Sequence, residues 1–172
     1  MKKKTILRRL LALMAAGTLC LGAALPAGAA ETASTIQVTQ TQGTVSVTNS
    51  RGRDLSLRDN MRLYSGYQVT TEKSSYVWLN LDDAKLAKQD AASVVEVRKD
   101  GKKLELLVSS GGLYFNVTEP LASDETLNIR TSSMVTGVRG TCGWVESVDS
   151  GHSQVYVLEG RLECQVTDPV SG

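Results

Sequence analysis

The chain has 172 residues, with 19 basic and 18 acidic side chains, one histidine and three cysteines. Its first thirty residues contain five basic and no acidic residues, so residues 31–172 contain 14 basic and 18 acidic residues, a net charge of −4. A mildly acidic chain without a basic cluster argues against binding to nucleic acid or to an anionic membrane surface. Its one histidine and three cysteines do not have the spacing of a zinc site.

Residues 1–30 have the pattern of a secretory signal peptide. A basic head is followed by an apolar run from Leu10 to Leu25, and then by Pro26 and small residues. This order predicts export with cleavage after Ala29 or Ala30, and an uncleaved membrane anchor is the alternative. No apolar run of about 18 residues follows Pro26, so we expect no later membrane span. The predicted location is therefore extracellular or associated with the cell envelope.

After a polar leader, alternation of apolar and polar residues predicts short β-strands along the rest of the chain. We expect strands near residues 36–38, 45–47, 76–81, 95–98, 104–108, 113–117, 127–129, 134–148, 153–158 and 161–166. Asp100-Gly101 and Ser110-Gly111-Gly112 are typical of turns. Leu81 to Val94 lacks a sustained helical face and is interpreted as turn, short strand, turn. About ten short strands without a helix predict an all-β fold, a twisted β-solenoid or a sandwich-like domain.

One pattern occurs twice at an offset of 49 residues. Val108-x-x-Gly111-x-Leu113-x-x-x-Val117 matches the spacing of Val157-x-x-Gly160-x-Leu162-x-x-x-Val166, and Gly43-x-Val45 is a fainter third copy. Repeated strand–glycine–strand corners favour a stacked β architecture. The alternative is that the pattern only reflects what any hairpin corner looks like, and the sequence does not decide between the two.

Catalytic chemistry has little support in this sequence. His152 lies in a turn beside Asp149, Ser150 and Ser153, and consecutive turn residues point in different directions, so no catalytic triad is predicted. No phosphate-binding loop or dinucleotide fingerprint occurs. We therefore expect a non-enzymatic protein that uses neither a metal nor a cofactor.

Cys142 and Cys164 are the two cysteines that follow the predicted signal peptide. Export would place them where a disulfide persists, and closing a loop of about 23 residues would stabilise the fold by roughly 3 kcal/mol. The alternative is a pair of free thiols that pack as small apolar side chains. The sequence leaves both alternatives open.

Four aromatic residues define a candidate binding face. If Val77, Leu113 and the apolar residues in phase with them face the core, then Tyr76, Trp78, Tyr114 and Tyr156 face outward. Outward aromatics on strands favour a flat platform for a glycan or a partner protein. The alternative is cross-strand aromatic pairing that only stiffens the sheet, by about 0.2–1 kcal/mol per pair.

Several segments, in a consistent order, resemble the FecR domain. Leu63–Thr71, with Gly66 before a short strand ending in threonine, resembles the opening of that domain, and Val108–Val117 with Gly111 resembles its central strand–glycine–strand. Val138, Arg139, Gly140 and Thr141 are similar to its most specific motif, and Val155–Gly160 to its closing hairpin. The whole is similar to the stand-alone exported FecR-type proteins of clostridia-like bacteria.

The resemblance implies an all-β module that senses or relays a signal through protein contacts in the envelope, with no catalytic residues. It implies structural roles for the motif residues, and an unidentified envelope protein as partner; a cell-wall or polysaccharide ligand is the alternative. The family's iron regulators hold a sigma factor through a cytoplasmic segment, which is not predicted here, so we do not expect that role. An aromatic residue usually follows the Gly-Thr motif where this chain has Gly143, and a β-bulge is predicted there.

These observations divide the chain into four parts. We expect a signal peptide at 1–30, a leader and N-terminal β segment at 31–62, a FecR-like β domain at 63–167 and a tail at 168–172. Residues 167–172 are typical of a turn that leads into another strand. Either a further strand is missing from this product or the tail frays.

Overall fold

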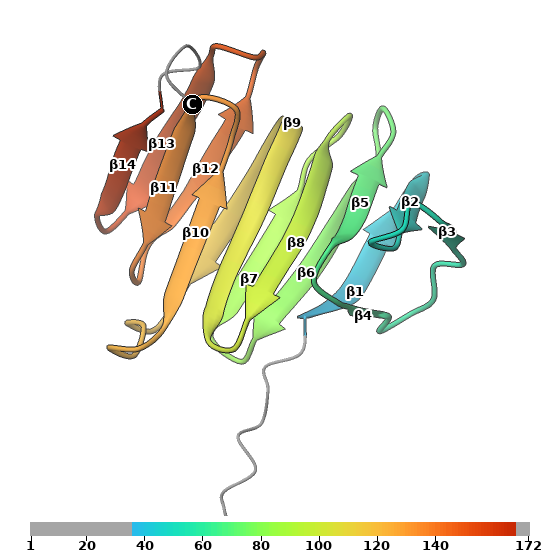
Figure 1. Cartoon of the computed structure of the whole chain (residues 1–172), viewed down its shortest axis with the longest axis horizontal. Coiled ribbons are helices and arrows are strands. Elements are labelled where there is room, and N and C mark those ends of the chain that lie inside the picture. Colours follow the sequence, from blue (N-terminus) through green and yellow to red (C-terminus); the bar gives the residue numbers. More distant parts are fainter. Residues whose placement is uncertain (1–35, 168–172) are drawn as a thin grey trace, which may run out of the picture. The chain divides into compact units, whose positions relative to one another are not determined.

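The computed structural model describes residues 36–167, which form an all-β fold without a helix (Figure 1). The predicted signal peptide, leader and tail lie outside the described residues. Fourteen strands are present: β1 (Ile36–Gln42), β2 (Val45–Thr48), β3 (Asp54–Leu55), β4 (Arg62–Leu63), β5 (Tyr67–Thr71), β6 (Tyr76–Asp82), β7 (Lys85–Gln89), β8 (Val94–Asp100), β9 (Lys103–Val117), β10 (Thr126–Arg130), β11 (Met134–Val138), β12 (Cys142–Ser147), β13 (Ser153–Glu159) and β14 (Leu162–Val166). The predicted fold class is confirmed. Within residues 36–167, no helix exists that could cross a membrane.

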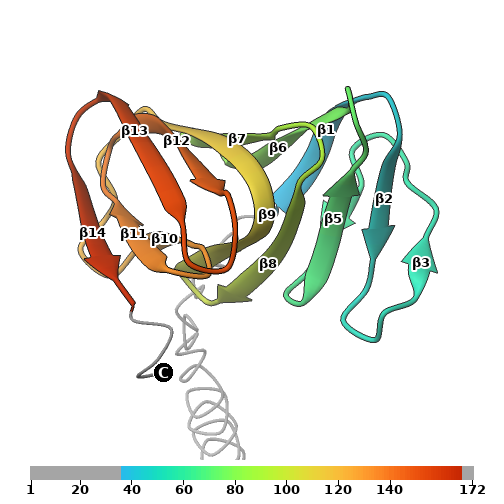
Figure 2. The same ribbon diagram turned by 90° about the horizontal axis from the view of Figure 1, so that it is seen from above.

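The strands form two layers that share β9 (Figure 2). We call the layer with the order β4-β1-β6-β7-β9-β12-β13 sheet A. Sheet B has the order β3-β2-β5-β8-β9-β10-β11-β14. Neighbouring strands are antiparallel except for β9 and β10, which are parallel. The C-terminal half of β9 lies in sheet A and its N-terminal half in sheet B.

A single apolar core fills the space between the two sheets. Burial alternates along each central strand: on β6, Val77, Leu79 and Leu81 are almost fully buried, while the residues between them are partly exposed. The N-terminal strands contribute Ile36, Val38 and Val47 to the same core. The period-2 pattern of the sequence therefore sets which side of each strand faces inward.

The predicted turn at Ser110–Gly112 is wrong, because β9 passes through it as one strand of 15 residues. Gly111 has φ +73°, and a Cβ there would lie 2.8 Å from the Ala92 carbonyl oxygen and from Ser93 Cα. Just before it, Ser109 is the extra residue of a β-bulge, because Val94 of β8 pairs with Ser110 and Val95 pairs with Val108. The bulge also shifts by one residue which side chains of β9 face the core. Leu106 and Val108 face inward in sheet B, and Leu113 and Phe115 face inward in sheet A.

The predicted strand at 134–148 is also wrong in one respect, since it is divided into β11 in sheet B and β12 in sheet A. The chain bends at Gly140, where φ is +70° and an ordinary strand conformation ends. The β-bulge predicted near Gly143 is confirmed by a register shift between Cys142 and Gly143 in the β12–β13 pairing. The Asp100-Gly101 hairpin between β8 and β9 is likewise present.

Six of the crossings between the sheets come together in three pairs of corners. Each crossing holds a residue with positive φ: Gly43, Ser74, Ala92, Gly111, Gly140 and Gly160. In each pair a hydroxyl residue lies against the glycine of the other corner: Ser75 against Gly43, Ser93 against Gly111, and Thr141 against Gly160. The repeated pattern in the sequence therefore corresponds to equivalent corners, built three times.

The hydroxyl of each corner forms a hydrogen bond across it. Ser75 Oγ and Ser93 Oγ each accept the N–H of the residue that follows the facing glycine, at 2.9 Å. Thr141 Oγ1 instead donates to the Arg161 carbonyl oxygen at 2.8 Å. These bonds occupy buried hydroxyl groups and tie neighbouring corners together.

Near the ends of β6 and β7 that lie away from the corners, an ionic cluster is partly enclosed by protein. The Lys85 ammonium points inward and pairs with Asp82 and, at 2.5 Å, with Glu125 in the loop before β10. Burial by itself lowers the pKa of Lys85, but hydrogen bonds to both carboxylates outweigh it and hold that pKa above its usual value. Burial lowers the pKa of nearby Lys99, which Asp82 and Glu125 partly oppose.

A substitution at Gly111 tests whether the bend in β9 requires a glycine. Gly111→Ala should lower the free energy of unfolding by at least about 2 kcal/mol, because the new Cβ meets the Ala92–Ser93 backbone at positive φ. Gly101→Asn is the matched control: Gly101 also has positive φ, but nothing lies within 4 Å of its Cβ position, so we expect a change within about 0.5 kcal/mol. Urea unfolding of both variants measures the change in free energy of unfolding. Equal losses in the two variants would contradict a role for the contact between Gly111 and the Ala92–Ser93 backbone.

The Lys85 cluster predicts an alkaline loss of stability. A raised folded-state pKa contributes stability that is complete below the unfolded-state pKa, about 10.4, and is lost as pH rises through the folded-state value. Lys85→Met should therefore be less stable than the parent at pH 8 and lose less stability above pH 10, in urea unfolding at stepped pH. Lys102→Met, which breaks an exposed pair with Asp124, should keep the parental alkaline slope. A Lys85→Met variant with that same slope would refute the assignment.

Candidate functional site

Five side chains form a row across the outer face of sheet A. Trp78 lies opposite Lys88, Lys88 opposite Tyr114, Tyr114 opposite Trp144, and Trp144 opposite Tyr156. We call these five residues the aromatic row. Neighbouring strands lie about 4.8 Å apart, so the row spans roughly 19 Å across five strands. Its side chains point outward because the residues on either side of them, such as Val77 and Phe115, belong to the core.

Contacts within the face hold the rings in place. The Trp144 ring covers Gly112, where a Cβ would lie 2.5 Å from a ring carbon. Trp144 and Tyr156 have ring centroids 5.5 Å apart. The Lys88 ammonium lies 4.5 Å from the ring centroid of Tyr76 and 5.0 Å from that of Trp78. The face is therefore an ordered surface with partly exposed rings; Tyr156 is 52% exposed.

The structure brings three of the four predicted aromatics, Trp78, Tyr114 and Tyr156, into the row. Tyr76 lies beside it, with its ring 6.5 Å from that of Trp78. The sequence interpretation missed Trp144 and Lys88. Val145 could have predicted the outward direction of Trp144, because neighbouring residues of a strand point to opposite sides and Val145 is fully buried. Treating 134–148 as one strand concealed this alternation.

A second row of residues, which includes two asparagines, lies beside the aromatic row. Asn80, Leu86, Asn116 and Cys142 form this second row, in register on the same four strands, β6, β7, β9 and β12. Next to Trp78 is a hollow of about 280 Å³ with mainly apolar walls, whose lining includes Asn80, Leu86, Thr39, Thr118 and Asp83. An apolar wall with a few amide, hydroxyl and carboxylate groups around it is the usual composition of a small-ligand site.

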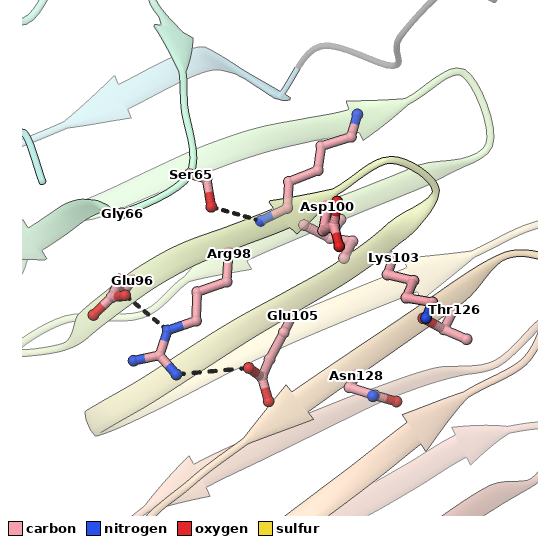
Figure 3. A pocket seen from close by; sticks show the side chains of 11 residues that line it. Ser65, Gly66, Glu96, Arg98, Asp100, Lys103, Glu105, Thr126 and Asn128 are labelled. Carbon is pink, nitrogen blue, oxygen red and sulfur yellow. Dashed lines mark hydrogen bonds and ion pairs between the residues drawn. The ribbon is translucent and has the colours of Figure 1, made fainter.

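The outer face of sheet B has a different chemistry (Figure 3). A hollow of about 530 Å³ is lined by residues such as Asp100, Lys103, Thr126 and Asn128. Arg98 pairs with Glu96 at 2.8 Å and with Glu105 at 3.7 Å. Glu105 also pairs with Arg130 at 2.5 Å. The hydrogen bond that Arg98 donates to the Glu96 carboxylate raises the pKa of Arg98. Because these charges pair across the strands, we interpret this face as a solvated, self-neutralised sheet surface.

Cys142 and Cys164 are free thiols on different sheets. Cys142 is on the outer face of sheet A, where its sulfur lies 3.0 Å from the Tyr114 hydroxyl. Cys164 is exposed on β14, and its sulfur lies 3.8 Å from Thr136 Oγ1 on the inner side of sheet B. Neither thiol is fully buried, so they do not pack as a pair of small apolar side chains.

His152 does not form a catalytic triad with its neighbours. Its exposed ring lies 2.8 Å from the Asp149 carboxylate, in the turn between β12 and β13. The Gly151 N–H, then the His152 ring, hold the pKa of Asp149 below its usual value. Ser153 Oγ instead bonds to the hydroxyls of Thr131 and Ser133, at 2.6 and 2.8 Å. Residues 148–152 are therefore a hydrogen-bonded turn at the end of the β12–β13 hairpin.

The residues of the predicted family motif lie in structural positions. Val138 is buried in the core, Gly140 and Thr141 form one corner, and Gly160 forms the corner facing it. Gly111 forms the β9 bend, and Gly66 has φ +83° with its Cβ position 2.7 Å from Ser50 Cβ. Arg139 lines a hollow of about 220 Å³ beside β10 and β11.

The last two strands leave one end of the sandwich open. In the described part of the chain, β13 pairs with β12 alone and β14 with β11 alone, so each keeps one edge of N–H and C=O groups unpaired by another strand. Apolar side chains are exposed here: Val157 at 48%, Leu158 at 68% and Val166 at 78%. Val157 is in the inward phase of β13 and is half uncovered, because no other strand of residues 36–167 packs beyond it. We call these two strands the open edge.

The family model described as "FecR protein" matches residues 67–163, more than half of the chain. No similar protein was found among curated proteins or among solved structures. The match runs from β5 into β14 and includes two of the three corner pairs completely, so the family pattern coincides with the repeated corners.

The two thiols should differ in reactivity without any reduction step. Under non-reducing conditions, iodoacetamide should label exposed Cys164 faster than Cys142, which is partly buried and hydrogen-bonded to Tyr114. Tyr114→Phe should speed the labelling of Cys142 relative to Cys164, as measured by peptide mass spectrometry. A native mass two hydrogens lower, with no labelling before reduction, would show instead that the thiols are joined.

Proposed function

The chain belongs to the FecR family, whose domain is a signalling and sensing module of the cell envelope, and from this membership we propose an exported, non-enzymatic module that senses or relays a signal through protein contacts. The family match over residues 67–163 is the observation that carries the proposal. The signal-peptide pattern of residues 1–30 supports export. The partner would be another protein of the envelope.

The open edge is the surface that we assign to the partner. Unpaired strand edges accept an extended segment of another protein, whose backbone continues the sheet while its side chains enter adjacent pockets. The exposed apolar side chains of Val157, Leu158 and Val166 would be covered by that segment. The partner we propose is therefore a protein that supplies an extended, apolar strand to β13 or β14.

A binding role agrees with the side-chain chemistry of residues 36–167. His152, the histidine of the chain, bonds to Asp149, and the nearest serine hydroxyl in sequence bonds elsewhere. Within the described range, no group of three or more metal-ligating side chains converges. The FecR family is a regulatory family that is not known for enzymes, so contact with a partner is the activity we assign.

Charging the open edge should abolish partner binding. The double variant Val157→Lys, Val166→Lys places solvated ammonium groups on both edge strands, which prevents strand addition, so recovery of the partner should fall at least about tenfold. Val148→Lys is the matched control, because Val148 is 51% exposed but lies outside the edge. The measurement is quantitative mass spectrometry of proteins retained by the tagged full chain from envelope extracts.

Two results would count against this proposal. Recovery of no specific protein by the parent chain would argue against a protein-contact role. Equal recovery by the parent and by the double variant would place the contact on another surface.

A further inference from the structure

We infer that the outer face of sheet A binds an uncharged polysaccharide, which lies across the strands along the aromatic row. The aromatic row meets the open edge only at Tyr156 on β13, and the inference does not depend on the proposed protein contact. Four rings and Lys88 lie in register on five adjacent strands, while the opposite outer face of the molecule has paired charges in the corresponding region. The two faces therefore have different binding chemistry.

The dimensions of the row fit an extended chain of sugar rings. Pyranose rings have apolar C–H faces that stack on aromatic side chains, and aromatic groups at successive strands provide a flat series of stacking positions. The row is roughly 19 Å long, which is several sugar units. Packing of Trp144 on Gly112 and of Trp78 beside Lys88 orders these rings before a ligand binds, which lowers the entropy cost of binding.

Amides lie where they can bond to sugar hydroxyls. Asn80 and Asn116 are partly exposed in the second row, and Gln154 on β13 bonds through its Oε1 to the Tyr156 hydroxyl at 2.9 Å. An amide both donates and accepts hydrogen bonds, as a sugar hydroxyl does. The hollow beside Trp78 adds the hydroxyls of Thr39 and Thr118 and the carboxylate of Asp83 at one end of the row. Aromatic pairing that only stiffens the sheet would not require these amide, hydroxyl and carboxylate groups beside the rings.

Charge excludes a polyanionic ligand. Lys88 is the cation of the aromatic row, and its ammonium already lies over two rings. Glu146, between Gly112 and Gln154 on the same face, is acidic, and residues 31–172 have a net charge of −4. A polymer of phosphates or sulfates needs several cations along its path, so an uncharged glycan is the class of polymer that matches this face.

Both tryptophans of the chain, Trp78 and Trp144, lie in the row, so intrinsic fluorescence reports on this site directly. The full chain is titrated with hexasaccharides of β-1,4-linked glucose and of β-1,4-linked N-acetylglucosamine, and its retention on purified cell-wall glycan is measured. We expect a saturable shift of the tryptophan emission with at least one hexasaccharide, and retention on the wall glycan. Trp78→Ala and Tyr156→Ala should each weaken binding about tenfold.

Controls separate binding from stability. Tyr64→Ala removes an aromatic side chain that is 58% exposed outside the row, and should bind as the parent does. Tyr156 is on an edge strand, so its replacement keeps the test valid if Trp78→Ala does not fold. Asn116→Ala, which keeps all the rings, should also weaken binding.

The inference is overturned if neither hexasaccharide changes the emission and the wall glycan retains nothing. It is equally overturned if binding persists unchanged in both Trp78→Ala and Tyr156→Ala. Loss of a copurifying protein in those variants, without glycan binding by the parent, would assign this face to a protein instead.

Discussion

The close contact between Gly111 and the Ala92–Ser93 corner is the constraint on which the rest of the structure depends. β9 pairs with β8 and β10 in sheet B and with β7 and β12 in sheet A, so its bend joins the two layers. The bend requires positive φ and the room of a glycine. Beneath it, the Gln89 amide donates to the carbonyl oxygens of Val69 and Ser93, at 3.0 and 2.8 Å. These bonds bind β5, β7 and the corner together inside the core.

Repetition of that corner explains why a short chain forms two well-covered layers. Each pair of corners sends two neighbouring strands from one sheet to the other together, so the strands remain hydrogen-bonded to each other in both sheets. The hydroxyl at each corner bonds to the backbone that the bend would otherwise leave without a partner. The inner faces then fill one common core, and the outer faces remain available for binding.

The outer surfaces differ because different side chains occupy the outward phase of the strands. On sheet A this phase holds the aromatic row and its amides, and on sheet B it holds ion pairs such as Arg98 with Glu96 and Glu105. The open edge adds a third surface, where backbone groups and apolar side chains are exposed together. A sensing module with a glycan-binding face and a protein-binding edge would report contact with the wall to a partner, and the two surfaces meet at Tyr156 on β13.

The sequence by itself determined the features that depend on one strand or one turn. Alternation along Tyr76–Leu81 and Leu113–Val117 showed which residues face the core, Asp100-Gly101 showed a hairpin, and the ordered glycine motifs showed the family. Only the tertiary structure decided that Trp78, Lys88, Tyr114, Trp144 and Tyr156 share one row. It also decided that β9 bends without reversing, and that Cys142 and Cys164 lie on different sheets. The physical reason is distance along the sequence. Which side of a strand a residue faces is a local property of the backbone, whereas strand register pairs residues as far apart as Lys88 and Tyr114. That register follows from the bend at Gly111, which packing against Ser93 imposes from outside the strand.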